Sequence, residues 1–237
     1  MTLGNLLCFP YAGAGAGLFR TWPQRHPFRH TRVVPVQLPG REERFAEPPC
    51  ESMADLVEAC LPLALETAAG GPTALFGHSF GALVAYEVAQ RLTAEGVRIE
   101  RLVVSGAAAP WLPRPRIGVA ELDDDALVSR VRALVGYDHP ALHDPELRQL
   151  LLPSLRADLG ITERYAPSVT AVLPAPVTAL LGTDDELVSS DEAALWSKAG
   201  APGSGLRHLP GGHMYFATDP GPLAATLDGL LAPDADG

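Results

Sequence analysis

The sequence is poor in positive charge. Lys198 is the only lysine, and 18 Lys and Arg residues stand against 28 Asp and Glu, which gives a formal net charge of −10. Sequence-independent binding of nucleic acid needs a basic face, so this balance argues against that function. A Walker-type phosphate loop and a lysine Schiff base both need a suitably placed lysine. Lys198 lies in WSKAGAPGSG, a pattern typical of a helix end and a loop, so neither chemistry is expected.

Cysteine is scarce, and the few histidine pairs do not form a metal-binding pattern. The spacing of the three cysteines matches no disulfide or zinc framework, so they are expected to be inert and largely buried. Two histidine pairs have helical spacing, but a proline interrupts each pair and no third ligand is evident. We therefore expect no metal site. These residues are Cys8, Cys50, Cys60, His26, His30, His139 and His143.

Long apolar runs are also missing. No stretch approaches the roughly 20 apolar residues of a membrane span. The first residues, MTLGNLLCFP, lack the basic start and long apolar centre of a signal peptide. The expectation from the sequence is a cytoplasmic protein without a membrane partner.

Short apolar runs alternate with helical patterns along the rest of the chain. Because the runs are continuous in Val and Leu, they predict a parallel sheet covered by helices on both faces. This is an α/β pattern, expected as a single domain over residues 1–237, with a frayed tail, APDADG. The predicted strands are 6–9, 32–38, 73–77, 101–106, 177–182 and 206–210, and helical patterns cover 53–68 and 82–95.

The segment between the fourth and fifth strands is too long for a simple crossover. It opens with the proline-rich PWLPRPR and then carries two amphipathic helical patterns, DDDALVSRVRALVG and DPELRQLLLPSLRADLGITERYA, the second with a kink expected at Pro153. We interpret residues 111–170, the lid segment, as a helical insertion over the carboxyl ends of the strands.

A serine lies at the corner between the third strand and the following helix. The sequence Gly77-His78-Ser79-Phe80-Gly81 fits G-x-S-x-G, and the apolar strand before it and helix after it are the context of a nucleophile elbow. Glycines flank the serine because side chains there would collide with neighbouring backbone. Ser79 is therefore predicted to be a strained, exposed nucleophile, while His78 should point away from the site and pack in the interior.

A serine nucleophile needs a base and an acid that orients the base. In this arrangement the chain order is Ser, then Asp or Glu, then His, at the carboxyl ends of strands. LPGGHMYF, after the last strand, supplies His213 as the candidate base. LLGTDDEL, after the fifth strand, supplies Asp184 and Asp185, and the pattern alone leaves either as the acid.

The glycine-rich CFPYAGAGAGLF follows the first strand. Backbone in this place can supply an N–H group for an oxyanion hole. A dinucleotide loop is the rival interpretation, but Leu18 stands where G-x-G-x-x-G needs its last glycine, and no acidic residue ends the next strand. Nucleotide binding is therefore not expected.

With these residues identified, the chain resembles the type II thioesterases of polyketide and nonribosomal peptide synthesis, within the α/β-hydrolase superfamily. The resemblance covers nearly the whole length and depends on five blocks in order: FPYAGAGAGLFRTW, QLPGREERFAEPP, GHSFGALVAYEVA, LGTDDELVSSDEAALW and LPGGHMYF. It implies an α/β-hydrolase fold with a helical lid. It also implies Ser79 as nucleophile, Asp185 as acid, His213 as base, and the backbone amides of Ala12 and Phe80 as oxyanion hole.

The resemblance further implies a function. Such enzymes release stalled or aberrant acyl groups from the phosphopantetheine arm of acyl or peptidyl carrier proteins, and they need no cofactor of their own. A generic esterase or lipase, an acyltransferase and a non-catalytic carrier-binding module are the alternatives, because fold and triad do not fix the substrate.

Carrier proteins of this kind present acidic helices, by the same resemblance, so an acidic enzyme needs a local basic surface to bind them. Arg44, in QLPGREERF, and Arg114 and Arg116, in PRPR, are candidates for this docking. Arg41, in the same segment as Arg44, is a fourth possibility, but it has a second interpretation as a buried anchor of its loop.

Overall fold

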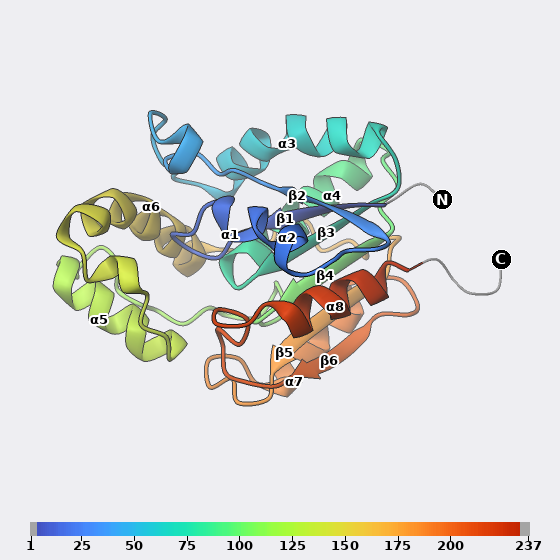
Figure 1. Cartoon of the computed structure of the whole chain (residues 1–237). Coiled ribbons are helices and arrows are strands. Elements are labelled where there is room, and N and C mark those ends of the chain that lie inside the picture. Colours follow the sequence, from blue (N-terminus) through green and yellow to red (C-terminus); the bar gives the residue numbers. More distant parts are fainter. Residues whose placement is uncertain (1–3, 233–237) are drawn as a thin grey trace.

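Six parallel strands form one central sheet in the computed structural model, which describes residues 4–232 (Figure 1). Their order is β2-β1-β3-β4-β5-β6. Every predicted strand is confirmed, although β2 ends at Pro35 and not at Leu38. The predicted tail, 232–237, lies outside the described residues except for Ala232. The strands are β1 (Gly4–Phe9), β2 (Thr31–Pro35), β3 (Thr73–His78), β4 (Arg101–Ser105), β5 (Val177–Gly182) and β6 (Gly205–Leu209).

Helices cover both faces of the sheet, as the continuous apolar strands predict (Figure 1). One face is covered by α3 and α4, and the other by α1, α2 and α8. The two predicted helical patterns correspond to α3 and α4. The α-helices are α1 (Gly17–Arg20), α2 (Trp22–Arg25), α3 (Met53–Ala69), α4 (Phe80–Ala94), α5 (Asp124–Val135), α6 (Pro145–Arg164), α7 (Ser190–Ala194) and α8 (Gly221–Leu230), and the 3₁₀ helices are η1 (Glu42–Arg44), η2 (Pro140–Leu142) and η3 (Leu195–Ala199).

Each strand supplies side chains to two separate cores. In β1, Leu7 and Phe9 pack with α3 and α4, whereas Leu6 and Cys8 pack with the helices of the opposite face. Successive side chains of a strand point to opposite faces, so a strand buried on both sides has no polar position to alternate with. All these side chains are fully buried, which fixes the sheet as a rigid platform for the loops at its carboxyl ends.

The lid segment contains α5, η2 and α6, which lie together at the left end of the molecule in Figure 1. Asp123 caps α5 by accepting from Ala126 N, and Gly136 ends it in the left-handed region with φ 62°. Asp144 caps α6 in the same way, and α6 continues through Pro153 as one helix. Leu127 of α5 packs against Leu152, Leu155 and Leu159 of α6, so the two helices share a small core of their own.

Candidate active site

Ser79 lies in the sharp turn between β3 and α4. Its backbone has φ 54° and ψ −117°, a strained conformation for a residue with a side chain. A Cβ at Gly77 would lie 2.0 Å from Gly81 O, and a Cβ at Gly81 would lie 2.3 Å from Phe9 O. Both glycines are therefore required for the turn, as expected from the sequence. Ser79 N donates to Ser105 O at 2.7 Å, which ties the turn to the neighbouring strand.

The structure brings His213 and Asp185 to this serine. His213 Nε2 lies 3.2 Å from Ser79 Oγ, and His213 Nδ1 lies 2.9 Å from Asp185 Oδ2. The side chains of His213 and Asp185 are 2% and 0% exposed. Because β5 and β6 are adjacent and parallel, the loops after them converge at the same edge of the sheet as the turn that holds Ser79.

Asp185 and not Asp184 faces the histidine. Asp185 Oδ1 accepts hydrogen bonds from Leu187 N at 2.9 Å and Val188 N at 3.1 Å, which leaves Oδ2 for His213. Burial raises the pKa of the Asp185 carboxyl, but the hydrogen bond and charge of His213 and these two N–H groups outweigh burial and hold the pKa below its usual value. Asp184 is exposed, and its carboxylate accepts a hydrogen bond from Thr183 Oγ1.

Ala12 and Phe80 lie beside Ser79 along the same cavity. The N–H of neither residue has a hydrogen-bond partner among residues 4–232. Phe80 is the first residue of α4, where the helix leaves its N–H groups free and the helix dipole favours negative charge. The two N–H groups are thus available to an oxygen that becomes negatively charged next to Ser79.

An apolar cavity of about 160 Å³ opens on Ser79 and His213. The glycine-rich loop after β1 forms one wall, with Tyr11 and Ala12. The lid segment forms another, with Val128 and Val131 of α5 and Leu151, Leu155 and Leu159 of α6. A cavity of this size and lining suits a short apolar chain joined to a carbonyl at the serine.

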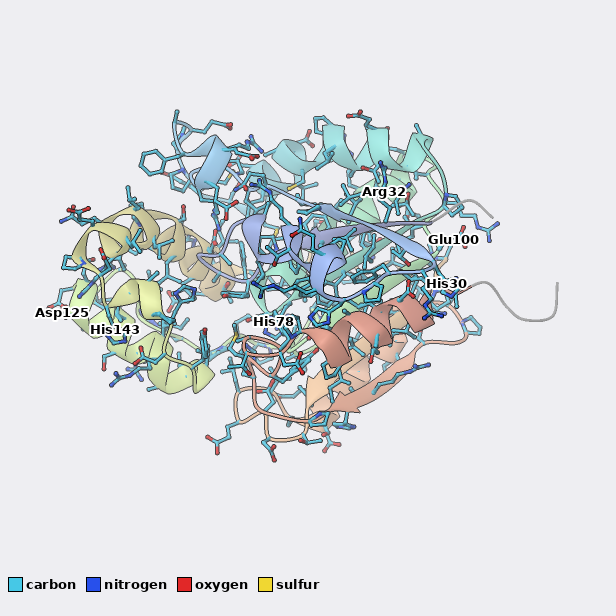
Figure 2. The ribbon with its side chains drawn as sticks, viewed as in Figure 1. His30, Arg32, His78, Glu100, Asp125 and His143 are labelled. Atoms are coloured by element: carbon cyan, nitrogen blue, oxygen red, sulfur yellow. The ribbon has the colours of Figure 1, made fainter. Side chains whose placement is uncertain are left out.

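His78 is buried, as predicted, but it does not pack away from the site. Its ring is fully buried and its centroid lies 5.0 Å from that of His213, and the label of His78 stands near the middle of the molecule in Figure 2. His78 Nδ1 pairs with Ser105 Oγ at 2.9 Å, and Ser105 Oγ pairs with Tyr215 Oη at 2.8 Å. Burial, and secondly the charge of His213, lowers the pKa of His78 well below its usual value, so this ring is neutral.

Sequence reasoning missed Gly106, which makes this packing possible. A Cβ at Gly106 would lie 2.6 Å from His78 Cε1 and 3.1 Å from His213 Cε1, and its φ is 56°. The glycine directly after the fourth strand was the available signal, because a glycine at a strand end marks a close approach by another part of the chain.

The four arginines considered for docking differ in their surroundings. Arg114 is half-buried, donates to the carbonyls of Ala108 and Ala109 and lies over the ring of Tyr165, so the structure does not favour it for docking. The guanidinium of Arg44 already contacts the Glu47 carboxylate and two backbone carbonyls, so the structure does not favour Arg44 for docking either. The side chain of Arg116 is 83% exposed, and within the described part of the chain its polar contact is with Glu121 alone. Arg41 is a buried anchor, the second interpretation given above.

The remaining polar groups give no metal-binding cluster. Within residues 4–232 no group of three or more His, Cys, Asp or Glu is arranged to hold a metal ion. His30 and His143, one from each histidine pair, lie far from each other in Figure 2. Cys8 and Cys60 are buried, and burial raises the pKa of both thiols. In the same described range, the helices are too short or too polar to cross a bilayer.

A parallel sheet with a strained serine elbow, followed in chain order by an aspartate and a histidine at its carboxyl edge, defines the class of α/β hydrolases. Comparison with known proteins narrows this class. The thioesterase-domain family model matches residues 5–229, and the chain belongs to the thioesterase family. It is accordingly a thioester hydrolase.

The chain is similar to thioesterases of antibiotic pathways. Thioesterase PikA5 of Streptomyces venezuelae is 41% identical over 214 residues, which are 90% of this chain and 75% of PikA5. Gramicidin S biosynthesis protein GrsT of Aneurinibacillus migulanus is 32% identical over 213 residues, 90% of this chain and 82% of GrsT. The solved type II thioesterase BorB of the borrelidin biosynthetic cluster has a TM-score of 0.86 at 34% identity, over 98% of this chain and 94% of BorB. The resemblance to type II thioesterases is confirmed.

Proposed function

We propose that this protein hydrolyses acyl groups from the phosphopantetheine arm of acyl or peptidyl carrier proteins. In this proposal Ser79 is the nucleophile, His213 the general base and Asp185 the acid that orients the base. The observation that carries it is the hydrogen-bond chain from Asp185 through His213 to Ser79, which opens on an apolar cavity. A serine hydroxyl at its free pKa is a weak nucleophile, and such a chain is the arrangement that activates it.

The reaction proceeds through an acyl-enzyme. Ser79 Oγ attacks the thioester carbonyl carbon while His213 Nε2 takes the hydroxyl proton, and charge develops on the carbonyl oxygen near the N–H groups of Ala12 and Phe80. The C–S bond then breaks, and the pantetheine sulfur takes the proton from His213. A water molecule deprotonated by His213 attacks the serine ester, which releases the carboxylic acid and restores Ser79. These are proton and acyl transfers without oxidation or reduction, so the proposal includes no cofactor.

The relatives support the editing role. PikA5 is named as a thioesterase, GrsT as a gramicidin S biosynthesis protein, and BorB as a type II thioesterase of a biosynthetic cluster. We infer that this chain likewise removes stalled or aberrant acyl groups in polyketide or nonribosomal peptide synthesis. The lid segment covers the cavity with α5 and α6, and we assign carrier docking to the exposed Arg116, whose neighbours Pro115 and Ile117 line the cavity.

Two comparisons test this function. Ser79→Ala should lower thioester turnover by about 10⁴-fold or more while the variant still binds the acyl carrier protein, because only the residual effects of binding and the oxyanion hole are left. A variant that keeps more than a few per cent of the rate would contradict the assignment of Ser79.

The second comparison concerns the substrate. Acyl-carrier thioester, acyl-pantetheine thioester and the oxygen ester of the same acyl group are supplied at equal concentration, and kcat/KM is measured for each. We expect the carrier thioester to be preferred. A preference for the oxygen ester would identify a generic esterase of the same fold.

A further inference from the structure

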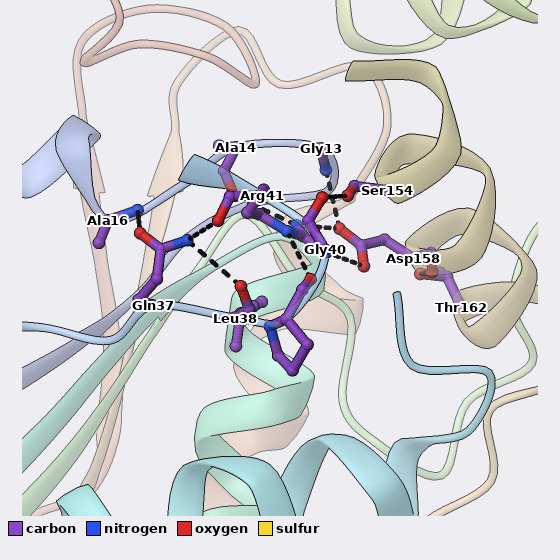
Figure 3. Close-up of polar contacts among 11 residues, drawn as sticks. Gly13, Ala14, Ala16, Gln37, Leu38, Gly40, Arg41, Ser154, Asp158 and Thr162 are labelled. Atoms are coloured by element: carbon purple, nitrogen blue, oxygen red, sulfur yellow. Dashed lines mark hydrogen bonds and ion pairs between the residues drawn. The ribbon is translucent and has the colours of Figure 1, made fainter. Parts of the chain in front are cut away.

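A buried ion pair joins the lid segment to the loop after β2. The Arg41 guanidinium contacts the Asp158 carboxylate through two bonds, Nη1–Oδ2 at 2.6 Å and Nη2–Oδ1 at 2.9 Å. The two side chains are 4% and 1% exposed. Figure 3 shows the pair between α6, which carries Asp158, and the segment around Gly40. The residues are 117 positions apart in sequence, so the contact depends entirely on the tertiary fold.

The same carboxylate also binds the glycine-rich loop that lines the active site. Asp158 Oδ2 accepts a hydrogen bond from Gly13 N at 2.8 Å, and Arg41 Nη1 donates to Ala14 O at 3.2 Å (Figure 3). Gln37 extends the network, since its Oε1 accepts from Ala16 N and its Nε2 donates to Arg41 O. One buried pair therefore holds three segments: the loop after β1, the loop after β2, and α6.

The contact at Gly13 is next to the oxyanion N–H group. Gly13 has φ 76°, a conformation open to glycine, and the neighbouring sequence YAGAGAG has little intrinsic stiffness. Fixing the peptide between Ala12 and Gly13 restricts the adjoining torsions of Ala12, and with them the direction of Ala12 N–H. Hydrogen-bond donors stabilise a transition state most when they are already oriented before charge develops.

We propose that Asp158, held by Arg41, is a positioning residue for the oxyanion hole and makes the orientation of Ala12 N–H depend on the docked position of α6. This inference rests on the proposed function. Leu155, one turn before Asp158, packs on the same loop, because a Cβ at Gly13 would lie only 3.1 Å from Leu155 Cδ1. Movement of α6 away from the sheet removes the acceptor of Gly13 N–H and leaves Arg41 buried without its partner. Closure of the lid and completion of the oxyanion hole are then one event.

The decisive variant removes the pair without leaving a buried charge. In Arg41→Met with Asp158→Leu, apolar side chains of similar volume keep α6 packed, since such replacement of a buried ion pair is often neutral for stability. Asp158→Asn is the second variant, which keeps the shape of the side chain and removes its charge. Ser154→Ala is the matched control: Ser154 lies one turn earlier on α6 and ties that helix to Gly40 O at 2.8 Å, with no contact to Gly13.

The experiment compares transition-state and ground-state binding. Each variant is measured for kcat and KM with an acyl-pantetheine thioester, for inhibition by butylboronic acid and butyrate, and for thermal stability. A boronate bonded to Ser79 places an oxygen in the oxyanion hole, whereas butyrate reports binding in the cavity. We expect the double variant to lose at least tenfold in kcat and in boronate affinity, with KM and butyrate affinity within twofold of wild type. Asp158→Asn should lower kcat and boronate affinity in the same direction by a smaller factor, because its amide oxygen can still accept from Gly13 N while its NH2 group then opposes Arg41. This variant carries the comparison if the double variant does not fold.

Ser154→Ala should keep kcat and boronate affinity within twofold even where its melting temperature falls. If the double variant and Asp158→Asn match Ser154→Ala in both quantities, Asp158 only anchors the lid and the inference is wrong. Wild-type protein without thioester turnover would overturn the proposed function and this inference together. Normal wild-type turnover with unaffected Asp158 variants overturns the inference alone.

Discussion

Replacing Asp185 by asparagine changes the charge and proton content of one buried atom while it preserves the shape of the side chain. Oδ1 of the asparagine still accepts from Leu187 N and Val188 N, which hold the wild-type side chain at 2.9 and 3.1 Å. The amide Nδ2 then occupies the position of Oδ2, 2.9 Å from His213 Nδ1 in the wild type. Because Nδ2 is a donor, it favours the tautomer of His213 whose proton is on Nε2. That nitrogen then cannot take the proton of Ser79.

Two contributions raise the activation free energy of the Asp185→Asn variant. The transition state places a positive charge on His213, and its attraction to the carboxylate is about 4 kcal/mol for unit charges 4 Å apart at an effective dielectric constant near 20. In the productive tautomer His213 carries its proton on Nδ1, which then faces the Nδ2 donor of the asparagine. The hydrogen bond between these two groups is lost, which adds about 1–2 kcal/mol to the activation free energy. The sum of about 5–6 kcal/mol corresponds to a loss of about 10⁴ in kcat. Asparagine in place of the aspartate of a serine triad has an effect of this order.

Asp184→Asn is the matched control, because the same chemical change then falls on an exposed neighbour whose carboxylate accepts a hydrogen bond from Thr183 Oγ1 and from no other described residue. Release of the pantetheine thiol is followed with a thiol reagent for both variants and wild type, at pH 7.5 and at saturating substrate. We expect Asp184→Asn within twofold of wild type. Circular dichroism melting shows whether each variant is folded at the assay temperature.

Two results would refute this reasoning. If Asp184→Asn is the more damaging change, the wrong aspartate has been assigned. If folded Asp185→Asn keeps more than a tenth of wild-type kcat, His213 does not depend on the charge or the tautomer control of Asp185, and the proposed triad is wrong.

Three further predictions concern the lid, the docking surface and the pH dependence of stability. Leu151→Trp puts a bulkier side chain into the wall of the cavity and should lower kcat/KM for an octanoyl thioester at least tenfold more than for an acetyl thioester. Equal losses for the two thioesters would mean that the lid segment does not set the preferred chain length. Arg116→Glu should raise KM for an acyl-carrier thioester about threefold at low salt and leave KM for acyl-pantetheine unchanged, because a rim charge acts on the encounter with the partner; equal changes in KM would show that Arg116 shapes the cavity. His78 has a lowered folded pKa, so the folded state stays neutral while the unfolded chain gains a proton below its pKa of about 6.5. This contribution to stability is present above pH 6.5 and is lost as pH falls, by about 1.4 kcal/mol per pH unit, until the folded pKa is reached. Urea unfolding at pH 7.5 and 5.5 should therefore depend less on pH in His78→Phe than in wild type, and an identical dependence would contradict this account.

The sequence by itself determined the sheet and the place of the strained turn at Ser79. Strands buried on both faces must be continuously apolar, so short Val and Leu runs between helical patterns locate all six strands. The corner at Ser79 is local at Gly77, because a Cβ there would collide with Gly81 O inside the turn, whereas the conflict that requires Gly81 is with Phe9 O of the neighbouring strand β1. Amphipathic patterns likewise predicted the two helices of the lid segment, whose N-termini the structure shows to be capped by Asp123 and Asp144.

Only the tertiary structure decided which polar side chains meet. The choice between Asp184 and Asp185 depends on how the turn after β5 lies against His213, from a loop 28 residues later. The contact of Arg114 with the Tyr165 ring, the packing of His78 against His213 and the pairing of Arg41 with Asp158 likewise join segments that are distant in sequence. Local patterns report which face a residue occupies. A side-chain pair is fixed to within an ångström only when two backbone segments are both held by the packed sheet, and no sequence spacing records that distance.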